Sequence, residues 1–168
     1  YHYWEDGGMT YHNRYDSYEF IRGQEGDAWK AMVQPPWERL REKYHERQFG
    51  SEARNYFRYN IINREFIQEE KDFPSVQCFA HGHDFLDRNR DADNWLLQIE
   101  TFDPHEPFFS QRQYKDLYAQ HYSGYKGRHF DWPPYDFVKE TRDEVDHARH
   151  EYAALLSMLN SCASNVAC

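Results

Sequence analysis

The chain has 168 residues, enough for one domain, and carries a formal net charge of -9. This acidic balance argues against a nucleic-acid partner, because phosphate backbones require a basic face, and no apolar run is long enough to predict a membrane span. Aromatic residues make up 18% of the chain, which argues against disorder. We expect most of them to form the core, although aromatic residues also line sugar-binding clefts.

The first third of the chain predicts one short strand followed by two helices. Residues 18–22 are a β candidate, and the glycine-containing stretch 23–26 indicates a turn after it. Pro36 favours a helix start, since proline suits the first helical turn. Residues 37–67 are charged and helix-favouring, so we expect two surface helices there, separated near Gly50.

The middle of the chain predicts a helix and then a buried strand. The helix is expected to begin at Pro74, and its apolar stripe comprises Val76, Phe79, Ala80, His83 and Leu86. Residues 95–99 (WLLQI) are apolar at nearly every position, which is typical of a strand buried on both faces in a parallel sheet. A helix followed by a buried strand predicts the α/β class, here with few strands and an excess of helix.

The last predicted helix spans residues 135–159, and its histidines raise the question of a metal site. His147 and His150 are three residues apart and could share a metal with Glu144 or Glu151. In an acidic helix a solvated charged face is the favoured interpretation. For His81 and His83, a packed histidine is favoured over a pair of metal ligands, because residues two apart on a helix point to different faces.

Residues 103–107 (DPHEP), hereafter the DPHEP loop, directly follow the predicted buried strand. Active sites in open α/β sheets form at the carboxyl ends of strands. Pro104 and Pro107 restrict the backbone, so the loop should hold the imidazole of His105 in a fixed position. This arrangement suits a catalytic or oxyanion-binding site, while a strand-terminating turn with a surface histidine remains equally open.

Residues 97–109 (LQIETFDPHEPFF) resemble the strand and loop of the sulfatase family, within the alkaline-phosphatase superfamily, whose loop has the form Asp-x-His-x-Pro-Phe. Further stretches are similar to one bacterial subgroup of that family, namely residues 1–8, 11–15, 20–27, 87–91 and 152–158. The resemblance implies that residues 1–158 are an internal part of a sulfatase catalytic domain, with a divergent tail at 159–168. The fold it implies is a partial alkaline-phosphatase-like sandwich.

The activity that this resemblance implies is metal-dependent hydrolysis of a sulfuric ester, on a small-molecule or carbohydrate substrate. His105 would be a catalytic and substrate-binding residue that contacts the sulfate or the leaving oxygen, and His2 would assist sulfate release. The family uses a formylglycine nucleophile beside a divalent cation, usually calcium. None of the three cysteines lies in a Cys-x-Pro-Ser-Arg motif, so the nucleophile and the metal ligands are expected outside this chain, which alone should be inactive.

Two other functions stay open at this point. A phosphodiesterase or phosphonate hydrolase of the same superfamily could use His105 in the same way, because phosphate and sulfate esters are similar tetrahedral oxyanions. A non-catalytic remnant or an aromatic-rich binding module would use the same residues for packing or for ligand contact, without a reaction.

Overall fold

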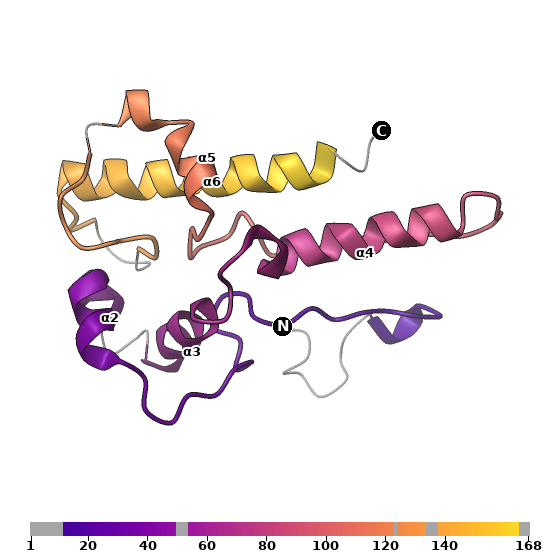
Figure 1. Cartoon of the computed structure of the whole chain (residues 1–168), viewed down its shortest axis with the longest axis horizontal. Coiled ribbons are helices and arrows are strands. Elements are labelled where there is room, and N and C mark those ends of the chain that lie inside the picture. The colour runs from indigo at the N-terminus through magenta and orange to yellow at the C-terminus, as the bar shows by residue number, and fades with distance from the viewer. Residues whose placement is uncertain (1–11, 50–53, 123, 134–137, 165–168) are drawn as a thin grey trace.

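A computed structural model of the protein describes residues 12–49, 54–122, 124–133 and 138–164. Within these ranges the chain is helical, and neither a strand nor a sheet forms (Figure 1). The predicted α/β class, with its partial alkaline-phosphatase-like sandwich, is therefore wrong for the described residues. An isolated parallel bridge joins Tyr44 to His129.

The described helices pack in two groups (Figure 1). The elements in chain order are η1 (His12–Arg14), α2 (Trp37–Lys43), η2 (Glu46–Phe49), α3 (Arg54–Arg64), η4 (Glu70–Asp72), α4 (Pro74–Arg88), α5 (Arg112–Asp116), η5 (Ala119–His121) and α6 (Arg142–Ser164). Helices α4 and α5 both pack against α6, while α2 and α3 lie on the opposite side of the molecule. None of the described helices is both long and apolar enough to cross a membrane.

Helix α6 begins later and ends later than the predicted range of 135–159. Its start is set by a capping box, in which the Thr141 backbone N–H donates to the Glu144 carboxylate at 2.7 Å and the Glu144 N–H lies 3.4 Å from Thr141 Oγ1. The helix continues without interruption to Ser164. Residues 159–164, which were predicted to belong to a divergent tail, are therefore part of the same helix as residues 142–158.

Helix α3 was predicted to lie on the surface, yet its last turn is buried. Asn60, Ile61 and Asn63 expose 4% of their surface or less. Asn60 Nδ2 donates to the carbonyl of Glu25 at 2.7 Å, and Asn63 Nδ2 donates to the carbonyl of Asp27 at 2.8 Å. The polar side chains thus satisfy backbone groups of the turn at residues 23–27, which allows a polar helix to be buried.

The segment predicted as a doubly buried strand, residues 95–99, is exposed on one side. Leu96 is 78% exposed, whereas Leu97 and Ile99 are half-buried and contact Gly82 of α4. A Cβ atom at Gly82 would stand only 2.5 Å from Ile99 Cδ1, so the glycine allows the close approach. Among the described residues no strand pairs with this segment, and alternate side chains therefore face solvent.

Residues 18–22, also predicted as a strand, form no strand either and run beside α4. Glu19 pairs with His81 of α4, with 2.7 Å between the carboxylate and Nδ1. The predicted turn at 23–26 is confirmed by the hydrogen bond from the Asp27 N–H to the Gln24 carbonyl at 2.9 Å. The start of α4 at Pro74 is confirmed as well.

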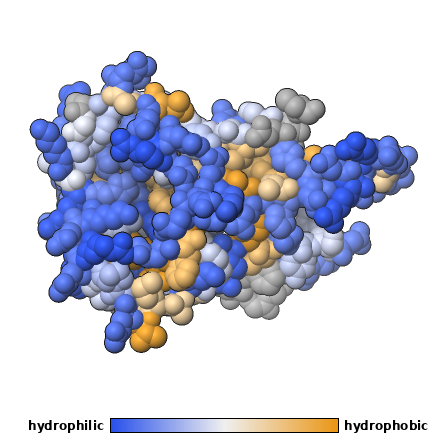
Figure 2. Space-filling model, in the orientation of Figure 1, coloured by the Kyte–Doolittle hydropathy of each residue, from blue (hydrophilic) through white to orange (hydrophobic). Residues whose placement is uncertain are grey.

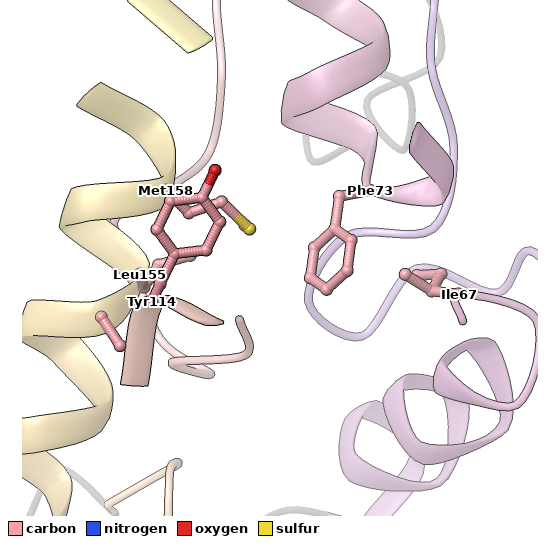
Figure 3. Close-up of a cluster of buried hydrophobic side chains, with 6 residues drawn as sticks. Ile67, Phe73, Tyr114, Leu155 and Met158 are labelled. Carbon is pink, nitrogen blue, oxygen red and sulfur yellow. The ribbon is translucent and has the colours of Figure 1, made fainter. Parts of the chain in front are cut away.

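Two hydrophobic cores hold the helices together. The α6 core comprises Ile67, Phe73, Tyr114, Ala154, Leu155 and Met158, and its side chains converge from α6, from α5 and from the segments around η4 (Figure 3). The α2–α3 core comprises Leu40, Tyr44, Phe57 and Ile61. Outside these cores the visible face is mainly hydrophilic, with apolar side chains in separate patches (Figure 2).

Candidate functional site

The DPHEP loop is anchored at its first residue. Ser75, in the first turn of α4, donates a hydrogen bond to the carboxylate of Asp103. Burial raises the pKa of Asp103 to about 6, and hydrogen bonds from Ser75 and Gln24 partly offset that rise. The carboxyl group therefore ties the loop to α4 and titrates near neutral pH.

His105 stands at the exposed tip of this loop in a defined orientation. Its side chain is 41% exposed, and its Nδ1–H donates to the carbonyl of Glu106 at 2.8 Å. The ring of Phe102 packs beside it, with 4.3 Å between the ring centroids. Because Nδ1 carries the proton in this arrangement, Nε2 is the nitrogen that can accept a proton from a ligand or, once protonated, donate one.

The second polar centre is buried and lies around Asp131. The Arg64 guanidinium donates to Asp131 Oδ2 at 2.7 Å, and His129 Nε2–H donates to the same oxygen at 3.0 Å. Burial alone would raise the pKa of Asp131, but Arg64 and His129 outweigh it and hold that pKa well below its usual range. Asp131 is therefore a fully buried carboxylate that stays ionised.

A line of hydrogen bonds extends from Asp131 through two imidazole rings to a tyrosine. His147 Nε2 lies 3.3 Å from His129 Nδ1, and the Tyr122 hydroxyl lies 2.9 Å from His147 Nδ1. Burial, together with the neighbouring His129, lowers the pKa of His147 to about 3. His147 is thus a neutral imidazole at physiological pH, and the whole line consists of paired polar groups.

Helix α6 contributes a carboxylate to the same place. Glu151 lies one helical turn after His147, is 3% exposed, and pairs with Lys115 at 2.5 Å between Nζ and Oε2. The ligand atoms of His129, His147 and Glu151 all lie within 4.8 Å of one another. We call these three residues the His–His–Glu cluster.

The His–His–Glu cluster does not fit the calcium ion that the sulfatase resemblance implies. Calcium takes six to eight oxygen ligands, whereas this cluster offers two imidazole nitrogens and a single carboxylate. That carboxylate is also paired with the Lys115 ammonium group. The expectation of calcium therefore rests on the resemblance to sulfatases alone.

Backbone hydrogen bonds connect the two polar centres and fix their positions. His129 exchanges hydrogen bonds with the chain after α2, donating to the Lys43 carbonyl and accepting from the His45 N–H, both at 2.8 Å. The Phe108 N–H, directly after the DPHEP loop, donates to the carbonyl of Asp131 at 2.9 Å. The loop that carries His105 therefore rests directly on the segment that carries the buried carboxylate.

The structure places the predicted site residues as follows. His105 stands on an exposed loop, as expected, but the loop does not follow a sheet strand. His2 lies outside the described residues. The solvated face predicted for the last helix is wrong at His147 and Glu151, which are buried, and Glu144 instead pairs with His45 at 2.9 Å.

Sequence reasoning missed Arg64, His129 and Asp131. His129 and Asp131 are two residues apart, but Arg64 lies on α3, far from both in the chain, and no local spacing links it to them. The i, i+4 spacing of His147 and Glu151 is the one local signal for the buried centre, because it places both side chains on the same face of a helix.

Comparison with known proteins found no matching family model, no matching curated protein and no matching solved structure.

Proposed function

We propose that this chain supplies the imidazole of a sulfate-ester hydrolase, with His105 as the group that meets the sulfate or the leaving oxygen. The observation that carries the proposal is the state of His105, which is exposed at the tip of a tethered loop while its Nδ1 is held by the Glu106 carbonyl. The resemblance of residues 97–109 to the sulfatase loop supports the same role. The helical fold of the described residues adds no support.

The chemistry required of His105 is simple. Cleavage of a sulfate ester develops negative charge on the bridging oxygen, and a protonated imidazole stabilises that charge by donating its proton. A fixed Nδ1 contact directs Nε2 to the ligand, and a loop anchored through Asp103 reduces the entropy cost of positioning it. Because no cysteine of the chain lies in a formylglycine motif, the proposal assigns binding and protonation to this chain, not nucleophilic attack.

The direct test is titration of the 168-residue chain with 4-nitrophenyl sulfate while the histidine ring signals are followed by NMR. We expect saturable shifts of the His105 ring, and loss of saturable binding in His105→Ala. His81→Ala is the matched control, because His81 is also exposed and also pairs with a carboxylate. Equal shifts at His81 and His105, or no shift at either, would contradict the proposal and favour a non-catalytic remnant.

Titration with 4-nitrophenyl phosphate distinguishes the related hydrolases. Bis(4-nitrophenyl) phosphate is the matching diester probe, and a clear preference of His105 for a phosphate ester over the sulfate ester would favour a phosphodiesterase or phosphonate hydrolase. Turnover is a separate readout: we expect the chain alone to release no nitrophenol from the sulfate ester with calcium present. Calcium-dependent release would show that a nucleophile exists within these residues.

A further inference from the structure

We propose that the His–His–Glu cluster is a binding site for a borderline transition-metal ion, with Zn²⁺ as the best fit. The site is separate from His105 and does not depend on the proposed hydrolase function. Its ligands would be His129 Nδ1, His147 Nε2 and the carboxylate of Glu151.

The distance between the two imidazole nitrogens matches what zinc requires. Zinc binds imidazole nitrogen at about 2.0–2.1 Å in tetrahedral geometry, which places two such nitrogens about 3.3 Å apart. His129 Nδ1 and His147 Nε2 stand 3.3 Å apart. A metal ion between them would replace one weak hydrogen bond by two coordinate bonds without moving either ring far.

In both rings the nitrogen that would not bind the metal already has a hydrogen-bond partner, as in metal-binding histidines. His129 Nε2–H donates to the buried Asp131 carboxylate at 3.0 Å, and His147 Nδ1 contacts the Tyr122 hydroxyl at 2.9 Å. Such outer contacts fix the ring orientation and the tautomer, and a carboxylate behind the ring strengthens the ligand. The outer contact of His147 permits the required tautomer, because the Tyr122 oxygen can accept a hydrogen bond from Nδ1–H.

The third ligand lies on the same face of α6 as His147, since Glu151 follows it by four residues. Lys115 competes for this carboxylate, but one oxygen can stay with the ammonium group while the other binds the metal. Two nitrogens and one carboxylate form a donor set that zinc uses in sites with three protein ligands and one open position.

The test is metal binding by the complete 168-residue chain. Zn²⁺ affinity is measured by calorimetry, and Co²⁺ serves as a visible-light probe of the ligand geometry. We expect one tetrahedral Co²⁺ spectrum without thiolate charge-transfer absorption, displaced by Zn²⁺. His129→Ala and His147→Ala should each weaken Zn²⁺ binding at least tenfold, while His81→Ala should leave the affinity unchanged.

Two milder variants keep the test decisive where a buried histidine is needed for folding. Tyr122→Phe removes only the hydroxyl behind His147 and should weaken binding about tenfold. Its matched control is Tyr118→Phe, whose hydroxyl contacts Ser157 and not His147. Lys115→Met removes the competing charge and should tighten binding. Far-UV circular dichroism checks that each variant keeps its helices.

Three results would overturn the proposal. The first is the absence of a tetrahedral Co²⁺ spectrum in the folded parent chain. The second is a spectrum dominated by thiolate absorption, which would place the metal on cysteine. The third is equal Zn²⁺ affinity in folded Tyr122→Phe, Tyr118→Phe and Lys115→Met, because the metal would then bind elsewhere.

Discussion

The loop around His105 and the buried centre around His147 are two ways of holding an imidazole ring. His105 depends on its own neighbours, since its ring contacts are Phe102 and Glu106. His147 depends on distant parts of the chain, and its ring contacts include Tyr122 and His129. The first arrangement leaves the ring open to a ligand, while the second places the ring within the packed structure. We therefore expect His105 to contribute mainly to ligand binding and His147 to contribute mainly to the stability of the fold.

The largest effect should come from the carboxylate beneath the buried centre. Asp131→Asn keeps the shape of the side chain but leaves the Arg64 charge buried without its counter-ion, at 4% side-chain exposure. We expect a loss of about 3–5 kcal/mol in the free energy of unfolding, measured with denaturant. Asp146→Asn, which removes a carboxylate that pairs with the exposed Arg149, should change this free energy by less than about 0.5 kcal/mol. Equal losses of unfolding free energy in the two variants would contradict the expectation that the buried ion pair stabilises the fold more than the exposed one.

Replacing each histidine with alanine, and measuring the free energy of unfolding in a metal-free buffer, tests the different roles of the two rings. His147→Ala should cost about 2 kcal/mol of unfolding free energy, because it removes one hydrogen-bond partner from the Tyr122 hydroxyl and one from His129 Nδ1. His105→Ala should cost less than about 0.5 kcal/mol, since the side chain is 41% exposed. A larger loss at His105 than at His147 would reverse the roles assigned to the two rings.

A smaller effect should appear in the pH dependence of stability. Burial raises the folded-state pKa of Asp103 from its ordinary value of 3.8 to about 6. The group binds its proton more tightly in the folded state, so its contribution is fully present below pH 3.8 and is lost as the pH rises through about 6. A shift of about two pKa units corresponds to about 3 kcal/mol, which is the upper bound on this loss.

The measurement for Asp103 is denaturant unfolding at a series of pH values between about 3.5 and 7, a range that includes both the ordinary and the shifted pKa of this carboxyl group. Asp103→Asn should remove the decline that this carboxyl group causes. Asp84→Asn is the control, because Asp84 forms an exposed pair with Arg88. An unchanged decline in Asp103→Asn would show that another group titrates in this window.

Local signals in the sequence predict the helices better than they predict what the helices contact. Pro74 marks the start of α4 correctly, and the Thr141–Glu144 capping box marks the start of α6, although only the first was recognised. The buried strand at residues 95–99 was predicted from its apolar residues alone. A strand needs a partner as well as an apolar sequence, and among the described residues none pairs with this segment.

The candidate site was likewise predictable from the sequence only in part. His105 could be found from sequence because five adjacent residues form its surroundings. The buried centre could not be found, because the partners of Asp131 come from α3, from η2, from its own segment and, through His129, from α6. Such a set is visible only once the helices are packed.

The position of Arg64 has a consequence for how the molecule opens. Its guanidinium lies 4.5 Å from the centre of the Phe109 ring, which packs on the α6 core, and 5.4 Å from the centre of the Tyr44 ring in the α2–α3 core. One side chain thus joins both cores as well as Asp131. If either core opened alone, the Arg64 guanidinium would lose part of its contacts. We therefore expect both cores to open together, as one foldon, so that their backbone amides exchange with solvent deuterium at similar rates.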